Sequence, residues 1–291
     1  ILGCDGQLGN ELSKIFVNEK NLKIFSRKTL DITNLTSVQN MIKFEKPSIL
    51  INAAAYTSVD QAEVNKEYAF NVNSNAVKNI ARSLEKLGSY LIHYSTDYVF
   101  DGLKEKPYNE LDYTSPINEY GRSKLEGEKN IIKYMSNFYI LRTSWIIGEY
   151  GNNFAKTILK LFNKKDSIEI VDDQFGVPTS TKLISKVSEK IVSEIKKSNP
   201  IKNGIYNIAP KGKTSWYGIS KKIYNNLLEL DNTFKYKKLI LKPVKSIDYP
   251  TLALRPKNSL LDTTKIKKCL DFDLPYWEDD LNDTLKSILN N

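Results

Sequence analysis

The 291 residues are enough to bury a large core and predict one large domain or two smaller ones. They carry 43 Lys and Arg against 34 Asp and Glu, and the resulting net charge of +9 arises after residue 150. Only five of the basic residues are Arg, the side chain that dominates base and phosphate recognition. The composition therefore argues against a nucleic-acid partner and is compatible with a small anionic substrate.

The sequence predicts neither a membrane span nor a disulfide framework. Its longest nearly apolar run covers residues 49–56, well short of the ~18 residues that a spanning helix needs. Two cysteines, Cys4 and Cys269, and a single histidine, His93, give no metal-ligand spacing. We expect a cytoplasmic protein that contacts no membrane and holds no metal.

The chain opens on a glycine-rich stretch, ILGCDGQLGNEL, with Gly3, Gly6 and Gly9 three residues apart before an amphipathic helix. Such a turn lets the backbone approach a pyrophosphate, which then lies at the positive helix N-terminus. By itself the triple suits a turn without a ligand equally well. Because only Ile1 and Leu2 precede Gly3, we expect a few further residues to complete the first strand.

Residues 23–34, KIFSRKTLDITN, occupy the position of the second strand and its end. Proteins that prefer NAD carry an acidic residue there, which holds the ribose 2′-hydroxyl. Ser26, Arg27 and Lys28 stand there instead and suit a 2′-phosphate. This pattern favours NADPH as the cofactor, with NADH possible.

Three short apolar runs, at residues 49–55, 90–95 and 139–147, resemble strands that are buried on both faces. Helix-like segments lie between them, such as residues 71–88. This alternation predicts an α/β fold with a doubly wound parallel sheet, the Rossmann arrangement. We expect residues 1–147 to form the dinucleotide-binding domain.

The regular alternation of apolar runs and helix-like segments changes beyond residue 147. Residues 151–165 and 181–197 have helical patterns, and residues 204–210 predict a short strand after a Pro/Gly-marked turn. We interpret residues 148–291 as a smaller, mixed C-terminal substrate domain. A segment near 173–197 is expected to return to the first domain.

The segment YGRSK places Tyr120 and Lys124 four residues apart in a predicted helix that begins near Ser115 and Pro116. An ammonium group close to the phenol would stabilise the phenolate and lower the pKa of the tyrosine. The motif alone carries little weight, because roughly two copies are expected by chance and a second, Tyr217/Lys221, is present.

The surroundings distinguish the first copy from the second. Thr96 and Asp97 follow the predicted strand at 90–95, and Ala55, Tyr56 and Thr57 follow the one at 49–55. Ligands of open α/β sheets bind beyond such carboxyl ends. Tyr217 has no such neighbours in the sequence. His93 lies inside a predicted strand, so we expect a buried structural role for it.

Taken in order, several segments resemble the dTDP-4-dehydrorhamnose reductases, which are extended short-chain dehydrogenases/reductases. The resemblance extends from Gly3 to about Thr263, and it is carried by GCDGQLG, LDITN, NAAAYTSVDQAE, HYSTDYVFDG, YGRSK, RTSWIIG, GNNFAKTIL, DDQFGVPTS and RPKNSLLDT. It implies that NADPH reduces the 4-keto group of dTDP-4-dehydro-β-L-rhamnose to give dTDP-L-rhamnose, a precursor of cell-surface polysaccharide.

The resemblance also implies roles for individual residues. Tyr120 would donate the proton, Lys124 would hold the nicotinamide ribose and tune Tyr120, and Thr96 would complete the catalytic set. The implied cofactor contacts are Gly3, Gly6, Gln7, Leu8, Gly9, Arg27, Asp31, Ile32, Ala55, Tyr56, Thr57, Tyr120 and Lys124.

The implied substrate contacts are Thr96, Asp97, Tyr120, Trp145, Asn153, Gln174 and Arg255, the last three towards the nucleotide end. Trp145 follows a predicted strand, where its indole suits either a sugar and nicotinamide or the core. The partner is thus a dTDP-sugar, and the protein is expected to be a monomer or homodimer.

Two other functions fit the same motifs. One is another reductase or epimerase of nucleotide sugars, because pocket shape decides specificity. An epimerase keeps its nicotinamide bound and shows no net consumption of added NADPH. The other is a non-catalytic regulatory binding subunit, which resembles this family and acts by association.

Overall fold

The computed structural model describes residues 1–230 and 238–290. Its centre is a parallel sheet in the order β1 (Ile49–Asn52), β2 (Tyr90–Thr96), β3 (Phe138–Thr143) and β8 (Gly204–Asn207). Leu2 extends the sheet beyond β1 through parallel bridges to Asn52 on one side and Phe25 on the other. The predicted doubly wound α/β fold is therefore confirmed.

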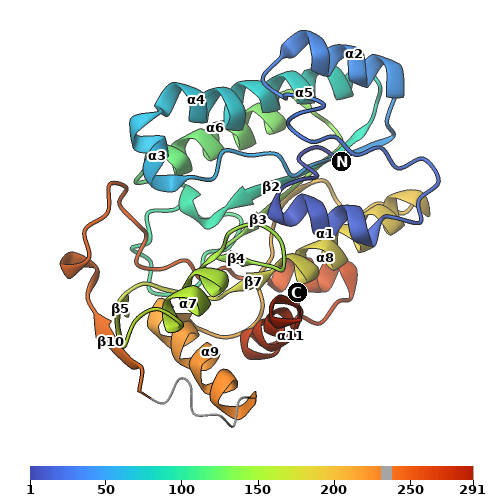
Figure 1. Cartoon of the computed structure of the whole chain (residues 1–291). Helices are drawn as coiled ribbons and strands as arrows, with labels where there is room; N and C mark the ends of the chain where they lie inside the picture. Colours follow the sequence, from blue (N-terminus) through green and yellow to red (C-terminus); the bar gives the residue numbers. More distant parts are fainter. Residues whose placement is uncertain (231–237, 291) are drawn as a thin grey trace.

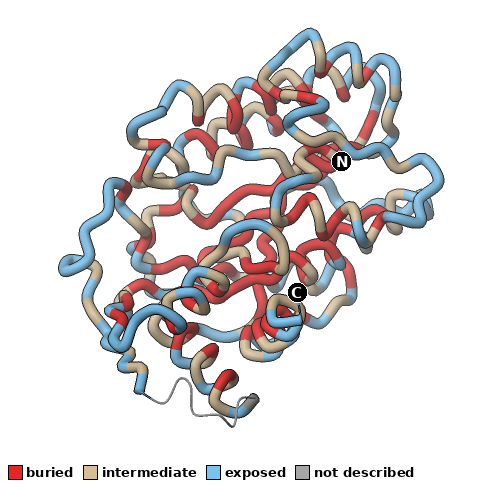
Figure 2. Tube along the Cα trace, viewed as in Figure 1, coloured by how far each residue is buried: buried red, intermediate tan, exposed pale blue. Residues whose placement is uncertain are grey.

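Helices cover both faces of this sheet (Figure 1). On one face lie α2 (Leu35–Glu45), α5 (Ala76–Glu85) and α6 (Glu119–Tyr134); on the other lie α1 (Gln7–Ile15) and α8 (Thr181–Lys196). Shorter turns of helix, α3 (Val59–Val64), α4 (Lys66–Phe70) and a π-helical turn η1 (Asn71–Asn75), precede α5. The strands between these layers are buried along most of their length (Figure 2).

Alternation along the strands divides the core between the two faces. Leu91 and Ile140 pack with the residues under α2 and α5, whereas Ile92 and Leu141 pack with those under α1 and α8. By the same alternation His93 shares the face of Leu91, which α6 covers.

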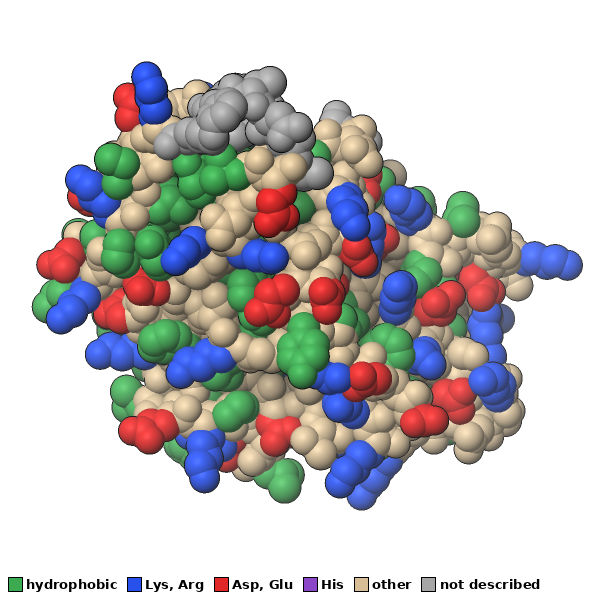
Figure 3. Space-filling view, turned by 90° about the horizontal axis from the view of Figure 1, so that it is seen from below, with side chains coloured by type: hydrophobic (Ala, Val, Ile, Leu, Met, Phe, Trp, Pro, Cys, Tyr) green, Lys and Arg blue, Asp and Glu red, His purple; other side chains and the backbone are tan. Residues whose placement is uncertain are grey.

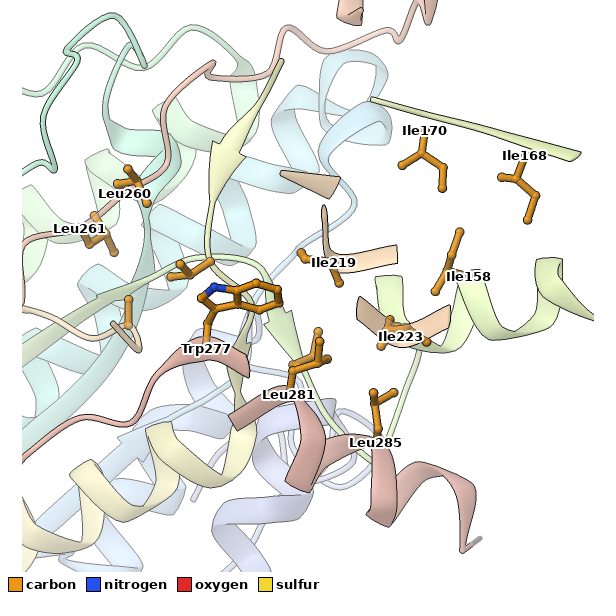
Figure 4. Close-up of a cluster of buried hydrophobic side chains, with 14 of the residues drawn as sticks. Ile158, Ile168, Ile170, Ile219, Ile223, Leu260, Leu261, Trp277, Leu281 and Leu285 are labelled. Carbon is orange, nitrogen blue, oxygen red and sulfur yellow. The ribbon is translucent and has the colours of Figure 1, made fainter. Parts of the chain in front are cut away.

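The remaining elements form a second region with its own core. They are η2 (Asp97–Val99), β4 (Ile146–Ile147), α7 (Phe154–Phe162), β5 (Ser167–Val171), β6 (Phe175–Gly176), β7 (Thr179–Ser180), β9 (Thr214–Ser215), α9 (Trp216–Leu230), β10 (Ile240–Val244), η3 (Ser246–Asp248) and α11 (Trp277–Leu289). Helix α10 (Thr264–Leu270) instead packs with the core under α1 and α8. Ile158, Ile219, Trp277 and Leu281 converge in this core (Figure 4).

Two predicted details were wrong. The strand predicted at 204–210 lies in the main sheet, where β8 pairs with β3, and not in the C-terminal substrate region. Helix α6 begins at Glu119 rather than near Ser115, because Asn118 accepts the Gly121 N–H at 2.8 Å and caps it. The predicted second domain, 148–291, also spans residues 231–237 and 291, which lie outside the described residues.

Charged side chains are mixed on the face shown in Figure 3, where Lys and Arg alternate with Asp and Glu. In the part of the chain that the structure describes, no helix combines the length and apolarity that crossing a membrane requires. The described residues also contain no group of three or more His, Cys, Asp or Glu placed to hold a metal ion.

Candidate active site

The glycine loop is packed so tightly that side chains are excluded from it. Gly3 has a φ of +77°, and a Cβ there would lie 2.7 Å from the backbone nitrogen of Ala54. A Cβ on Gly9 would lie 1.9 Å from the carbonyl oxygen of Gly3. The loop therefore brings the N-terminus of α1 against the ends of the first two strands, and glycine is required by contact at both positions.

The loop stands where the strand order reverses. From Leu2 the chain passes to Phe25 on one side of the sheet and then returns to β1 on the other. A cavity of about 320 Å³ opens at this switch point, the place where open α/β sheets bind ligands. It is lined by Gly3, Asp5, Gly6, Arg27, Leu30, Asp31, Ile32, Ala53, Ala54, Ala55, Tyr56, Tyr68 and Val72.

Aromatic and cationic groups form one wall of this cavity. The guanidinium of Arg27 lies 5.6 Å from the ring centre of Tyr68, which meets Tyr56 edge to face at 5.4 Å. Hydrogen bonds from Thr33 lower the pKa of Asp31, so its carboxylate stays ionised at the cavity wall. The wall thus offers a flat apolar surface beside both a cation and an anion.

The predicted catalytic residues meet at the carboxyl end of β2. Thr96 ends the strand, and its hydroxyl accepts the Tyr98 N–H at 3.1 Å and donates to Asp97 Oδ1 at 3.1 Å. Burial raises the pKa of Asp97 to about 7, against the lowering effect of contacts with Ser259 and Thr96. Asp97 Oδ2 is buried and has no hydrogen-bond partner among the described residues.

Tyr120, in the first turn of α6, reaches this strand end. Its phenol lies close to Thr96, and its ring meets that of Tyr98 edge to face at 5.7 Å. Burial raises the pKa of Tyr120 well above its ordinary value, so the phenol keeps its proton at neutral pH. A protonated phenol at a strand end is suited to give a proton to a substrate oxygen.

Lys124 is 2% exposed and lies one helical turn beyond Tyr120. Its Nζ donates to the carbonyl oxygen of Tyr94 at 2.7 Å and lies 3.3 Å from His93 Nε2. Burial lowers the pKa of Lys124 to about 8, and the nearby carboxylate of Glu128 opposes this. The expected lowering of the Tyr120 pKa is not found, because burial of the phenol outweighs its other contacts.

Trp145 lies beyond the end of β3 in a left-handed backbone conformation, with φ of +48°. That conformation is unfavourable for a bulky side chain and is held here by packing. Its indole stacks on Trp216 at 3.8 Å between ring centres and covers Gly176, where a Cβ would lie 2.7 Å from the indole. The Trp216 indole N–H donates to Gln174 Oε1 at 3.1 Å, and Gln174 Nε2 donates to Ser246 at 3.0 Å.

Three predicted residues have contacts other than those expected. Asn153 donates to Gln7 Oε1 at 2.8 Å and caps α7, so it adjoins the glycine loop. Arg255 is paired with the Asp60 carboxylate at 2.8 Å. Leu8 is buried in the core under the sheet.

The second Tyr/Lys copy lies elsewhere. Tyr217 packs in α9 against the second core, and Lys221 is exposed. Among the lining residues, no sequence pattern indicated Tyr68 or Val72, whereas Ala53 and Ala54 adjoin the predicted contact at Ala55. His93 is buried, as expected, and its Nε2 lies 3.3 Å from Lys124 Nζ. Asn52, which no pattern in the sequence singles out, lies 3.1 Å from His93 Nδ1.

A cavity at the switch point beside a glycine loop, with Tyr and Lys on the helix that covers the next strand, is characteristic of short-chain dehydrogenases/reductases. The model of the family described as RmlD substrate binding domain matches residues 1–290. The chain belongs to this family, and the predicted family and oxidoreductase class are confirmed.

Individual relatives support the assignment. The dTDP-4-dehydrorhamnose reductase of Aggregatibacter actinomycetemcomitans is 40% identical over 283 residues, covering 96% of this chain and 95% of the relative. A Bacillus anthracis dTDP-4-dehydrorhamnose reductase, solved in complex with NADP, superposes with a TM-score of 0.89 at 33% identity, covering 98% and 97%. A dTDP-4-dehydrorhamnose reductase structure from Clostridium acetobutylicum superposes with a TM-score of 0.89 at 32% identity, covering 100% of this chain and 98% of that structure.

Proposed function

We propose that the protein is an NADPH-dependent reductase of dTDP-4-dehydro-β-L-rhamnose that forms dTDP-L-rhamnose, with Tyr120 as the proton donor. The observation that carries this proposal is the buried phenol of Tyr120 beside Thr96 at the carboxyl end of β2. Relatives with this activity in their names match the chain over nearly its whole length.

The residues around the switch point fit a dinucleotide. Added side chains at Gly3 and Gly9 would collide with backbone, so the loop leaves bare N–H groups at the start of α1 for a pyrophosphate. Tyr56 and Tyr68 offer flat surfaces for a base, and Arg27 lies beside Tyr68 where a 2′-phosphate favours a cation. These contacts are the basis for preferring NADPH over NADH.

When bound, the reduced nicotinamide supplies the hydride for the keto carbon of the substrate. Tyr120 transfers its phenolic proton to the carbonyl oxygen as that oxygen gains negative charge. The Thr96 hydroxyl, which donates to Asp97 in this structure, turns its hydrogen to Tyr120 and stabilises the phenolate that remains. Burial of the phenol keeps the proton in place until the substrate oxygen can take it.

The other site residues hold the substrate. The unpartnered Oδ2 of Asp97 accepts from a sugar hydroxyl, and the indole of Trp145 covers the sugar ring. Gln174, whose side chain is held by its bond to Ser246, is assigned to the nucleotide end. In this proposal residues 1–147, α8 and β8 form the cofactor unit, and the rest of 148–291 supplies the substrate side.

The test follows the absorbance of NADPH, and then of NADH, as purified protein meets dTDP-4-dehydro-β-L-rhamnose. We expect wild type to consume NADPH faster than NADH, and Tyr120→Phe to lose about 10²–10⁴-fold in kcat, the usual contribution of a general acid. Tyr217→Phe is the matched control, because it removes the hydroxyl of the other Tyr/Lys copy and should leave kcat unchanged.

The outcomes separate the alternatives. A wild type that binds NADPH without net consumption contradicts the reductase and favours an epimerase or a binding subunit. Conversion of the sugar nucleotide without cofactor turnover would identify the epimerase. Equal losses in both tyrosine variants would remove Tyr120 from its proposed role.

A further inference from the structure

A line of buried groups joins the candidate cofactor cavity to Lys124. The backbone N–H of Ala54, which lines the cavity, donates to Asn52 Oδ1 at 3.2 Å. Asn52 Nδ2 lies 3.1 Å from His93 Nδ1, and His93 Nε2 lies 3.3 Å from Lys124 Nζ. Asn52 and His93 are each 1% exposed, so these groups depend on one another for hydrogen bonds.

The sheet register fixes this line. Asn52 of β1 is directly paired with His93 of β2, and the alternation of β2 directs His93 to the face under α6. Lys124 projects from α6 onto the same face, where its Nζ also donates to the Tyr94 carbonyl. A histidine one residue earlier or later in β2 would face the opposite core.

The hydrogen-bond directions constrain the proton on His93. Ala54 N–H can only donate, so the oxygen of the Asn52 amide faces Ala54 and its NH₂ faces His93 Nδ1. Nδ1 is then the acceptor. Burial and the neighbouring Lys124 lower the pKa of His93 well below its ordinary value, so the neutral ring carries its one proton on Nε2.

An Nε2–H that faces Lys124 suits an uncharged amine and opposes an ammonium. An ammonium has no lone pair to accept that hydrogen, whereas the amine accepts it and still donates to the Tyr94 carbonyl. When the amine takes a proton from solvent, His93 must carry its hydrogen on Nδ1 instead. The Asn52 amide must then turn, and the bond from Ala54 is lost.

We propose that His93 is a positioning residue for the reduction: it holds Lys124 beside the Tyr94 carbonyl and couples the charge of Lys124 to the cofactor cavity through Asn52 and Ala54. This inference rests on the proposed function, which gives Lys124 its place in the reaction. The carboxylate of Glu128 on α6 also acts on Lys124, and it forms a bidentate buried pair with Arg142 of β3 at N–O distances of 2.9 and 2.6 Å.

Nitrogen NMR can test the coupling without substrate, because His93 is the only histidine of the chain. Two-bond ¹H–¹⁵N spectra of the ¹⁵N-labelled protein distinguish the two tautomers. Between about pH 6 and pH 10 we expect a neutral ring whose proton moves from Nδ1 to Nε2, with a midpoint near 8, where burial places the pKa of Lys124. Lys124→Met should abolish this transition and leave a single tautomer.

His93→Gln supplies the kinetic test. Its amide can turn to accept from the Lys124 ammonium without a tautomer change, so the charged form should become easier to reach. We expect the apparent pKa near 8 in the pH profile of kcat/KM to rise by about half a unit to one unit. A shift of that size corresponds to the free energy of one hydrogen bond.

A merely structural histidine would give a different result. His93→Gln would then lower thermal stability and leave the pH profile in place. A wild-type ring that keeps one tautomer over the whole range, or becomes charged itself, overturns the proposal. Failure of the reductase reaction would appear only in the turnover assay, whereas the tautomer spectra judge the coupling separately.

Discussion

Gly9 offers a direct test of the loop on which the cofactor site depends. In Gly9→Ala the new methyl carbon would lie 1.9 Å from the Gly3 carbonyl oxygen and 2.8 Å from Cys4 Cα. Both neighbours are backbone atoms, so relief requires the loop and α1 to separate by about 1 Å or more. Overpacking of this kind costs about 1–3 kcal/mol, and contact with backbone places Gly9→Ala near the upper end.

The expected signature combines stability with binding. A loss of about 3 kcal/mol should lower the thermal midpoint by roughly 6 °C or more in a chain of this size. Because the same separation widens the loop that faces the pyrophosphate, the affinity for NADPH should fall at least tenfold. Differential scanning fluorimetry and quenching of tryptophan fluorescence by NADPH measure the two effects.

Gly88→Ala is the matched control. Gly88 has a φ of +66°, but a Cβ there meets no atom within 4 Å. Its substitution therefore costs only backbone strain, about 1–2 kcal/mol, and should leave NADPH binding unchanged. If Gly9→Ala is no less stable than Gly88→Ala and binds NADPH as wild type does, the steric account of the loop is wrong.

Three further predictions concern the site and its support. Arg142→Leu should cost about 3–5 kcal/mol in the free energy of unfolding, because it leaves the buried Glu128 carboxylate unpaired; the double variant with Glu128→Leu should recover much of this loss, as denaturant titration would show. Trp216→Leu should raise KM for the nucleotide sugar about three- to tenfold without changing the Kd for NADPH, because Trp145 loses its stacking partner; unchanged KM would exclude this support. Below pH 8, wild type must bury an ammonium at Lys124, and Lys124→Met should remove this cost of roughly 3 kcal/mol in the free energy of unfolding. The lost bond to the Tyr94 carbonyl should offset about 1 kcal/mol of that gain. Between pH 8 and 10.5 the unfolded chain binds the proton that folded Lys124 releases, so wild-type stability rises with pH and the advantage should disappear; a pH-independent difference in urea midpoints would contradict this.

The cofactor-binding half of the molecule follows from local patterns in the sequence. The glycine spacing at Gly3, Gly6 and Gly9 permits only a tight turn into a helix, and apolar runs such as 90–95 predict strands buried on both faces. These features depend on residues that are close together in the sequence. Periodicity and turn chemistry were therefore sufficient to predict them. The strand end at Thr96 and the helical pair of Tyr120 and Lys124 follow for the same reason.

Other features depended on contacts between distant segments. The sequence could not assign β8 to the main sheet, because its pairing with β3 joins residues more than sixty positions apart. The pKa of Tyr120 moved against expectation because the burial of its phenol depends on how α6 packs on β2. His93 joined the site because the register of β1 and β2 pairs it with Asn52 and turns it towards Lys124. The sequence determined which groups are present and which strands carry them, whereas tertiary packing decided their solvation and their partners, and these set the pKa values.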